Sequence, residues 1–409
     1  MRLLLLMSKC QLPSMMQSWC IKDVISYDSI IYDEMKRFEI RACYVSSLIV
    51  LLSSIMELSC TSEKNFQGEL EYFEDHADET ELQSHPIRLS NTFTPLVNIV
   101  DSKALCLNVT RGDFAFEIVD IRKGQILGDF CPIGHGHNEF LSLLPIQQIY
   151  QVGDEWKTML FAPNESRMVT WNITESIKKQ QTVYEHVVPY SWKDKSPVSY
   201  SKQVVISDDT LLLYTPSVST FPNDMVTDPI YQTRTLGTNE PIREIRVFAH
   251  CIDGKDSKVL PENFLDASFS LKPDRKKFVE AMNWLPQINI VDISSGHVSG
   301  FRMKNTQDED VFETDMDCAL FCYKRVVSDD RYIYALWAGC TRNKLSAEVA
   351  FDMVHVFDWN GKLVRKLKLD CPVSDLVMDF HDGSLYGWNT EEQVLYKYDM
   401  NFRSSKNPL

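Results

Sequence analysis

The chain has 409 residues, of which 44% are hydrophobic and 24% are charged, as is typical of a folded globular protein. Its 57 acidic and 42 basic residues give a formal charge of −15. This charge disfavours nucleic-acid binding, because that work needs clustered Lys and Arg against phosphate. No stretch reaches the roughly 18 uninterrupted apolar residues of a membrane-spanning helix.

The N-terminal part of the chain carries an export signal. Basic residues near Lys36 precede Ala42–Met56, which has no charged residue, and the sequence Leu58-Ser59-Cys60 follows. A basic n-region followed by an apolar h-region is typical of a secretory signal peptide. The segment resembles a bacterial lipoprotein signal over residues 35–59, in which the Cys60 thiol carries the lipid, although Glu57 departs from the usual pattern. An ordinary cleaved signal, with Cys60 as a bystander, is the alternative.

The segments on either side of this signal have different compositions. Residues 1–34 do not fit in front of a signal peptide, and the hypothesis is that they are a mis-annotated upstream extension with translation starting at Met35. Residues 60–90 are polar and acidic, with few branched aliphatic residues. Such a composition favours a solvated chain, so we predict an acidic flexible tether there.

Past residue 90, the sequence is a succession of short runs rich in Val, Ile, Tyr, Phe and Leu. Turn residues separate these runs, including Ser295-Gly296, Asn360-Gly361 and Asp382-Gly383. Such pairs suit tight turns between antiparallel strands. The predicted strands are FAFEIVDI (114–121), QVVIS (203–207), LLLYTP (211–216), EIRVFAHC (244–251), INIVDI (288–293), RYIYALWAG (331–339) and MVHVFDW (353–359).

These units recur at a regular interval. Turn-then-strand units start at Lys272, Ser328 and His381, which are 56 and 53 residues apart. A period of about 50 residues with four strands per unit indicates propeller blades. We therefore predict an all-β fold, a six-bladed β-propeller over residues 91–402 with about four antiparallel strands per blade, and a tail at 403–409. Long loops are expected around 176–202 and 217–242.

Two sequence blocks point to a known family. The first is the loop Ile133–Phe140 (IGHGHNEF), and the second is the late block VHVFDWNGKLVRKLKLDCPVSDLVMDFHDGSLYGWN. With the signal peptide, they resemble the TolB-like six-bladed propeller lipoproteins of Bacteroidetes. The resemblance implies the propeller fold and an envelope location, and it implies no catalytic residue, because its motifs are structural.

Seven cysteines lie after Cys60: Cys106, Cys131, Cys251, Cys318, Cys322, Cys340 and Cys371. Most of them lie in apolar runs, which favours small buried hydrophobic residues. Export leaves disulfides open as an alternative.

One loop contains residues suited to metal binding. His135, His137 and Glu139 alternate along it, so an extended backbone would point two imidazoles and a carboxylate the same way. The favoured interpretation is structural: Gly134 and Gly136 form the turn, Glu139 caps backbone amides and Phe140 fills the core. We predict neither a metal nor a cofactor, with a structural Ca²⁺ in the central channel as the alternative.

Two tryptophans are candidate ligand contacts. Trp192 and Trp284 have Pro- and Asn-containing surroundings, so exposure on the loop face would let them stack on a sugar or a partner. The favoured interpretation for the tryptophans is core or partly buried packing.

The sequence favours a non-catalytic, lipid-anchored propeller of the cell envelope, on the outer membrane, whose loop face binds a protein, peptide or glycan. It would be monomeric and touch the membrane only through its lipid. The alternative is a metal-assisted hydrolase or lyase at the central channel, with His135, His137 and Glu139 as its best residues. A Ser–His–Asp hydrolase is disfavoured, because the chain has no G-x-S-x-G sequence.

Overall fold

The computed structural model describes residues 65–89, 96–108, 112–143, 148–189, 202–215, 219–220, 225–226, 230–236, 238, 240–248, 265–313, 318–345, 349–379 and 381–400. The chain divides into Met1–Lys64 and Asn65–Leu409, and all described residues belong to the second unit. Predictions for residues 1–34, the signal at 35–59, Cys60, Trp192 and the tail at 403–409 therefore lie outside the described residues. No helix in the described part of the chain is long and apolar enough to cross a membrane.

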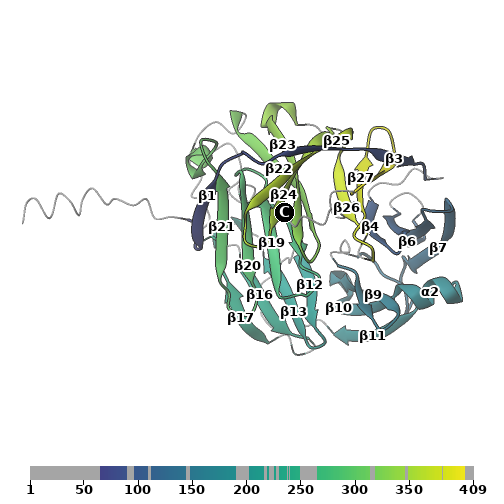
Figure 1. Cartoon of the computed structure of the whole chain (residues 1–409). Coiled ribbons are helices and arrows are strands. Elements are labelled where there is room, and N and C mark those ends of the chain that lie inside the picture. Colours follow the sequence, from purple (N-terminus) through teal and green to yellow (C-terminus); the bar gives the residue numbers. More distant parts are fainter. Residues whose placement is uncertain are drawn as a thin grey trace, which may run out of the picture. The chain divides into compact units, whose positions relative to one another are not determined.

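The second unit is a six-bladed β-propeller, so the predicted fold class is confirmed. In each blade the four strands are antiparallel and the first strand in sequence lies at one edge of the sheet. In five blades this edge strand lines a common cavity, so it is the inner strand of the blade. Figure 1 shows the blades. Blade I contains β4 (Leu96–Val100), β5 (Lys103–Leu107), β6 (Phe114–Asp120) and β7 (Gln125–Pro132). Blade II contains β8 (Tyr150–Val152), β9 (Glu155–Ala162), β10 (Arg167–Asn172) and β11 (Tyr184–Pro189), with helix α2 (Ile173–Lys179) before its last strand.

Blades III to VI continue the pattern. Blade III contains β12 (Lys202–Ser207), β13 (Thr210–Thr215), β16 (Ile230–Thr235) and β17 (Pro241–Ile245), with the hairpin β14 (Ser219–Thr220) and β15 (Met225–Val226) inserted. Blade IV contains β18 (Ala267–Leu271), β19 (Lys277–Met282), β20 (Gln287–Asp292) and β21 (Val298–Met303). Blade V contains β22 (Leu320–Ser328), β23 (Tyr332–Thr341), β24 (Phe351–Asp358) and β25 (Leu363–Val373). Blade VI contains β26 (Asp375–Met378), β27 (Leu385–Asn389) and β28 (Val394–Tyr398), and short 3₁₀ helices lie at Pro163–Glu165, Glu309–Glu313 and Arg342–Lys344.

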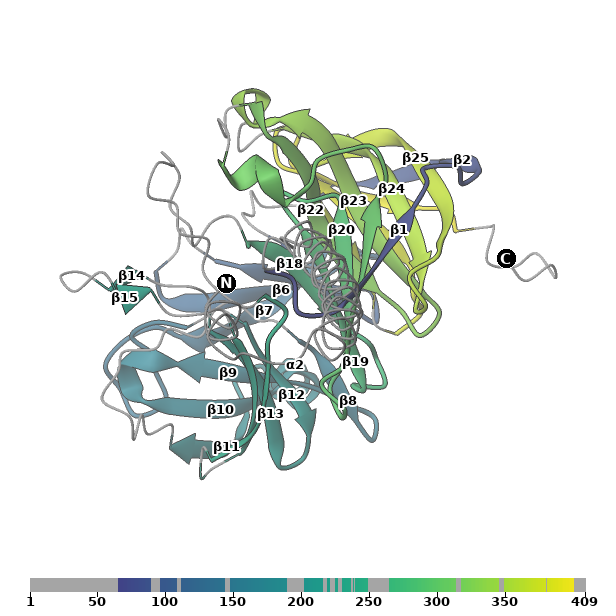
Figure 2. The same cartoon turned by 90° about the vertical axis from the view of Figure 1, so that its left-hand side faces the viewer.

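The N-terminal segment pairs with the outer edges of three blades. β1 (Glu69–Phe73) is parallel to β21, and β2 (Glu79–Leu82) is parallel to β25. β3 (Ser84–Ile87) is antiparallel to β28 and becomes the fourth strand of blade VI, which closes the ring between the two ends of the propeller sequence. The purple segment can be followed past these blades in Figures 1 and 2.

The prediction of a flexible tether over residues 60–90 is therefore wrong for the described residues 65–89. Their acidic side chains meet basic residues of the blades: Glu74 lies 3.2 Å from Lys304 Nζ, and Asp75 lies 3.3 Å from Lys366 Nζ. An edge strand is held by backbone hydrogen bonds, so it needs no apolar run, and it covers an edge that would otherwise stay unpaired.

Apolar contacts between blades hold the ring together. Six buried clusters are found among the described residues, and each joins neighbouring blades. In the cluster between blades I and II, Trp171 stacks on Phe116 with ring centroids 5.4 Å apart. Because each blade buries both faces against its neighbours, the strands are apolar on both sides, which explains the near-continuous apolar runs in the sequence.

Two predicted details of the blades need correction. The expected long loops at 176–202 and 217–242 contain strand β11 and strands β14 to β17. The run EIRVFAHC contributes only its first residues to a strand, because β17 ends at Ile245. The second half of blade III was missed because the last four residues of its strand β16 (IYQTRT) are all polar and the strand lacks the terminal Asp of the corresponding strands β6, β20 and β24.

Candidate functional site

A cavity of about 300 Å³ lies where the innermost strands of the propeller meet. Its walls come from five blades, through β4, β8, β18, β22 and β26, together with Trp156 on β9 and the turn between β18 and β19. Most of these residues lie at the ends of the inner strands that lead into the first hairpin turn of each blade. The antiparallel order places the loop Ile133–Phe140, which joins β7 to β8, at the opposite end of the blades.

The charged side chains that line the cavity are all basic. They are Lys272, Arg275 and Arg325, and no Asp or Glu is among the described lining residues. Lys272 Nζ lies 2.6 Å from Asp274 Oδ2, and Arg325 Nε lies 3.2 Å from Asp375 Oδ1. Two of the three cations therefore have a carboxylate beside them.

Arg275 differs from the other two cations. It lies in the turn between β18 and β19 with a left-handed φ of 59°, and its backbone N–H donates to the Lys272 carbonyl at 2.8 Å. Its guanidinium lies 5.0 Å from the centre of the Tyr150 ring. Among the described residues, no carboxylate lies within ion-pair distance of Arg275. Burial raises the pKa of Tyr150, so the ring under the guanidinium is a neutral phenol at physiological pH.

Uncharged polar groups and aromatic rings complete the wall. Asn98 on β4 and Gln151 on β8 line the cavity, and Trp156 is a half-buried ring beside them. The hydroxyls of Ser270 and Ser328 lie 2.8 Å apart and join the inner strands of blades IV and V.

The side chain of Gln148, in the same wall, has a structural role. Its amide donates to the Val205 carbonyl at 2.9 Å and accepts from the Val205 N–H at 2.8 Å. Both ends of this amide are engaged, so the side chain fastens blade II to blade III.

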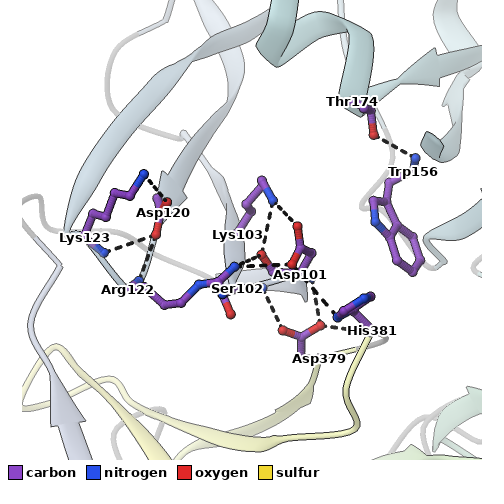
Figure 3. Close-up of polar contacts among 10 residues, drawn as sticks. All are labelled: Asp101, Ser102, Lys103, Asp120, Arg122, Lys123, Trp156, Thr174, Asp379 and His381. Carbon is purple, nitrogen blue, oxygen red and sulfur yellow. Dashed lines mark hydrogen bonds and ion pairs between the residues drawn. The ribbon is translucent and has the colours of Figure 1, made fainter. Parts of the chain in front are cut away.

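The hairpin turns of blades I and VI meet next to Trp156 (Figure 3). Asp379 is fully buried, and its carboxylate accepts backbone N–H groups from Asp101 at 2.9 Å, Ser102 at 2.8 Å and His381 at 2.9 Å. Asp101 and Ser102 have positive φ values of 46° and 57°, a conformation that costs energy for residues other than glycine. The buried carboxylate holds this turn in place.

Basic side chains surround Asp101 in this turn. Burial alone would raise the pKa of Asp101, but Lys103 at 2.5 Å, together with Arg122 at 3.3 Å and His381, lowers it overall. Asp101 is therefore ionised at neutral pH and forms part of a network of paired charges. His381 also meets the Trp156 ring edge-on, with ring centroids 6.3 Å apart.

The loop with His135, His137 and Glu139 forms a closed turn. Glu139 Oε2 accepts the Gly136 N–H at 2.7 Å, Phe140 is fully buried, and the side chains of His135 and His137 are exposed. A Cβ on Gly134 would lie 2.1 Å from Glu139 Oε2. The carboxylate thus points back onto its own loop, as the structural interpretation expected. Within the described residues, no group of three His, Cys, Asp or Glu side chains could hold a metal ion.

The other predicted site residues are dispersed. Trp284 is 9% exposed and packs edge-on against Phe321, so it lies in the core, as the packing interpretation expected, and is no exposed ligand contact. Its Asn-containing surroundings form the connection between β19 and β20, which folds inward between blades IV and V. The described cysteines are unpaired, and Cys106, Cys131 and Cys322 are buried, as the apolar runs predicted.

Sequence reasoning missed the residues of the cavity. Asn98, Gln151, Arg275 and Arg325 come from four blades, so no local motif contains them. One signal was available in the hairpin turns. The turn of blade IV reads KPDRKK, whereas the corresponding turns of blades III and V read SDD and that of blade VI begins HDG. This basic exception points to the blade that contributes Lys272 and Arg275.

The chain is similar to several proteins of known structure. Among solved structures, a DUF4221 family member from Bacteroides vulgatus aligns with 11% identity over 78% of this chain and 97% of its own, with a TM-score of 0.49. A Bacteroides fragilis protein, whose name marks it as a candidate for export, aligns with 10% identity over 81% and 98%, with a TM-score of 0.47. The calcium-binding protein regucalcin from Agrobacterium tumefaciens aligns with 10% identity over 78% and 95%, with a TM-score of 0.40.

No curated protein sequence matches the chain. The family model described as "TolB-like 6-blade propeller-like" matches residues 258–381, which include blades IV and V and the start of blade VI. Over this part the chain is similar to the TolB-like six-bladed propellers, and its own six small sheets form a six-bladed β-propeller.

Proposed function

We propose that the protein is a non-catalytic binding module of the cell envelope, exported and anchored to the outer membrane by a lipid on Cys60. Its partner is an envelope protein, a peptide or a glycan. The binding site is the cavity at the ends of the inner strands, which replaces the loop face favoured by the sequence. The apolar stretch before Cys60 supports the anchor.

The cavity is the observation that carries the proposal. Small-molecule sites are concave, mix apolar walls with a few converging polar groups, and enclose about 300–1,000 Å³. This cavity lies at the lower end of that range, with Phe269 and Val377 beside the polar side chains. Its guanidinium groups donate hydrogen bonds, and its amide and hydroxyl groups donate and accept them, which suits recognition better than acid–base chemistry.

A cavity-filling substitution tests the site. Gln151→Trp adds a large ring to the cavity wall, whereas Gln125→Trp makes the same change at an exposed position of β7 that does not line the cavity. Glycan arrays and crosslinking in intact cells should capture the same ligand with the wild type and Gln125→Trp, and lose it with Gln151→Trp. Equal capture by all three proteins would contradict the proposed site.

Protease treatment of intact cells tests the location. We expect the wild type to fractionate with the outer membrane and Cys60→Ala to be released from it. Loss of the propeller on protease treatment places it on the cell surface, and survival until lysis places it in the periplasm. A membrane-bound Cys60→Ala protein would overturn the lipid anchor.

A further inference from the structure

The cavity has a charge opposite to that of the protein. The chain has a formal charge of −15, yet the charged side chains lining the cavity are the basic residues Lys272, Arg275 and Arg325. A cleft lined by one sign of charge concentrates ligands of the opposite sign. The cavity therefore selects anions from a surface that otherwise repels them.

The ion pairs that these three cations form determine how much negative charge a ligand would have to bring. Asp274 stands beside Lys272 and Asp375 beside Arg325, so each of these pairs is close to neutral. Arg275 is left as the cation that lacks a carboxylate partner among the described residues. One unmatched guanidinium balances one negative charge, as on a carboxylate, whereas a phosphate monoester carries about −1.5 to −2 at pH 7.

The surroundings of Arg275 indicate the rest of the ligand. The Tyr150 ring supports the guanidinium by a cation–π contact, which leaves its N–H groups available for the two oxygens of a carboxylate. Trp156 offers an aromatic face, and the amides of Asn98 and Gln151 can both donate to and accept from hydroxyl groups. A ring with one carboxylate and several hydroxyls matches this set.

We infer that the cavity binds an acidic sugar, with its carboxylate on Arg275, its ring against Trp156 and its hydroxyls on Asn98 and Gln151. This inference rests on the proposed function and specifies its ligand. A uronic acid is the simplest member of this class. Neutral hexoses and phosphate should be poorer ligands, because neither combines one negative charge with a hydroxylated ring.

Titration calorimetry of the folded protein with D-glucuronate tests this assignment. The wild type should bind glucuronate, and Arg275→Gln should weaken binding about 10- to 100-fold, the range for loss of a charge-assisted hydrogen bond. Arg275→Lys should retain part of the affinity, because it keeps the charge but loses the fork of donors. The matched control is Arg243→Gln on the exposed strand β17, where the arginine donates to the Ser295 carbonyl at 3.0 Å.

Glucose, methyl glucuronate, acetate and inorganic phosphate complete the set of probes, and each should bind more weakly than glucuronate. Unchanged affinity in Arg275→Gln, equal binding of glucose, tighter binding of phosphate, or no binding of glucuronate would each overturn the inference. Glucuronate could show no binding while Gln151→Trp still abolishes ligand capture in cells and Gln125→Trp does not. In that case the ligand class is wrong and the proposed function stands. If glucuronate does not bind and the two Trp variants also capture the ligand equally well, the ligand class and the proposed site are both wrong.

Discussion

The loop Ile133–Phe140 and the cavity both contain several polar side chains, but these side chains have different partners. In the loop, the Glu139 carboxylate accepts a hydrogen bond from the Gly136 N–H, three residues away, and both histidines are exposed. In the cavity, Arg275 and Asn98 come from different blades and face a common space. Polar groups that are close in sequence tend to satisfy the backbone of their own turn, and groups brought together by tertiary structure remain available for a ligand.

The largest expected effect on stability comes from the turn that the Asp379 carboxylate holds beside the cavity. Asp379→Ala would leave the buried Ser102 N–H and the part-buried Asp101 and His381 N–H groups without their acceptor, so we expect a loss of about 3 kcal/mol in the free energy of unfolding. Denaturant titration measures this loss. The control is Asp382→Ala in the same turn, where the carboxylate accepts the exposed Ser384 N–H at 2.8 Å. Equal losses in both variants would show that burial of the Asp379 network does not matter.

A second, smaller effect concerns the pH dependence of stability, in which the buried His355 should differ from the exposed loop histidines. His355 is 2% exposed and stacks on Trp337, and burial lowers its pKa to about 4. The folded state then resists protonation that the unfolded state accepts below about pH 6.5, so stability falls as the pH drops from about 6.5 towards 4. Between pH 7 and pH 5 we expect His355 to contribute a loss of about 2 kcal/mol.

Denaturant titration at the two pH values checks this contribution with a matched pair of variants. His355→Gln should reduce the difference in stability between pH 7 and pH 5. His135→Gln should leave that difference unchanged, because the His135 side chain is exposed. An unaltered pH dependence in His355→Gln would assign the acid sensitivity to other groups.

The smallest effect tests the loop as a structural turn. Gly134→Ala would place a methyl group against Glu139 and displace its carboxylate, at a cost of about 1 kcal/mol. Thermal or denaturant unfolding measures this cost, and ligand binding at the cavity should not change. In a Glu139→Ala background the same substitution should cost clearly less. A full cost in that background would show that Glu139 does not set the requirement for glycine.

The repeating part of the fold could be predicted from local sequence. Runs such as INIVDI (288–293) and MVHVFDW (353–359) match β20 and β24 to within two residues, because blade strands are buried on both faces and read as apolar runs. Gly296, Gly361 and Gly383 have positive φ values of 77°, 81° and 70°, as the predicted turns require. The approximate 50-residue period then predicted the propeller.

The second half of blade III and the N-terminal segment could not be placed in this way. β16 is polar over its last four residues and has no terminal Asp. The segment with β1 to β3 is held by backbone pairing and by ion pairs such as Asp75–Lys366. An edge strand of this kind leaves little apolar signal in the sequence, because its partners supply both hydrogen bonds and opposite charges.

The sequence by itself determined the blade strands, the hairpin turns and the structural character of the Ile133–Phe140 loop, since all of these depend on residues a few positions apart. Tertiary structure alone decided how the ring closes through β3 and which side chains share the cavity. Arg275 and Asn98 line the same cavity because closure of the ring brings distant inner strands together. That contact depends on the packing of whole blades, and no local pattern encodes it.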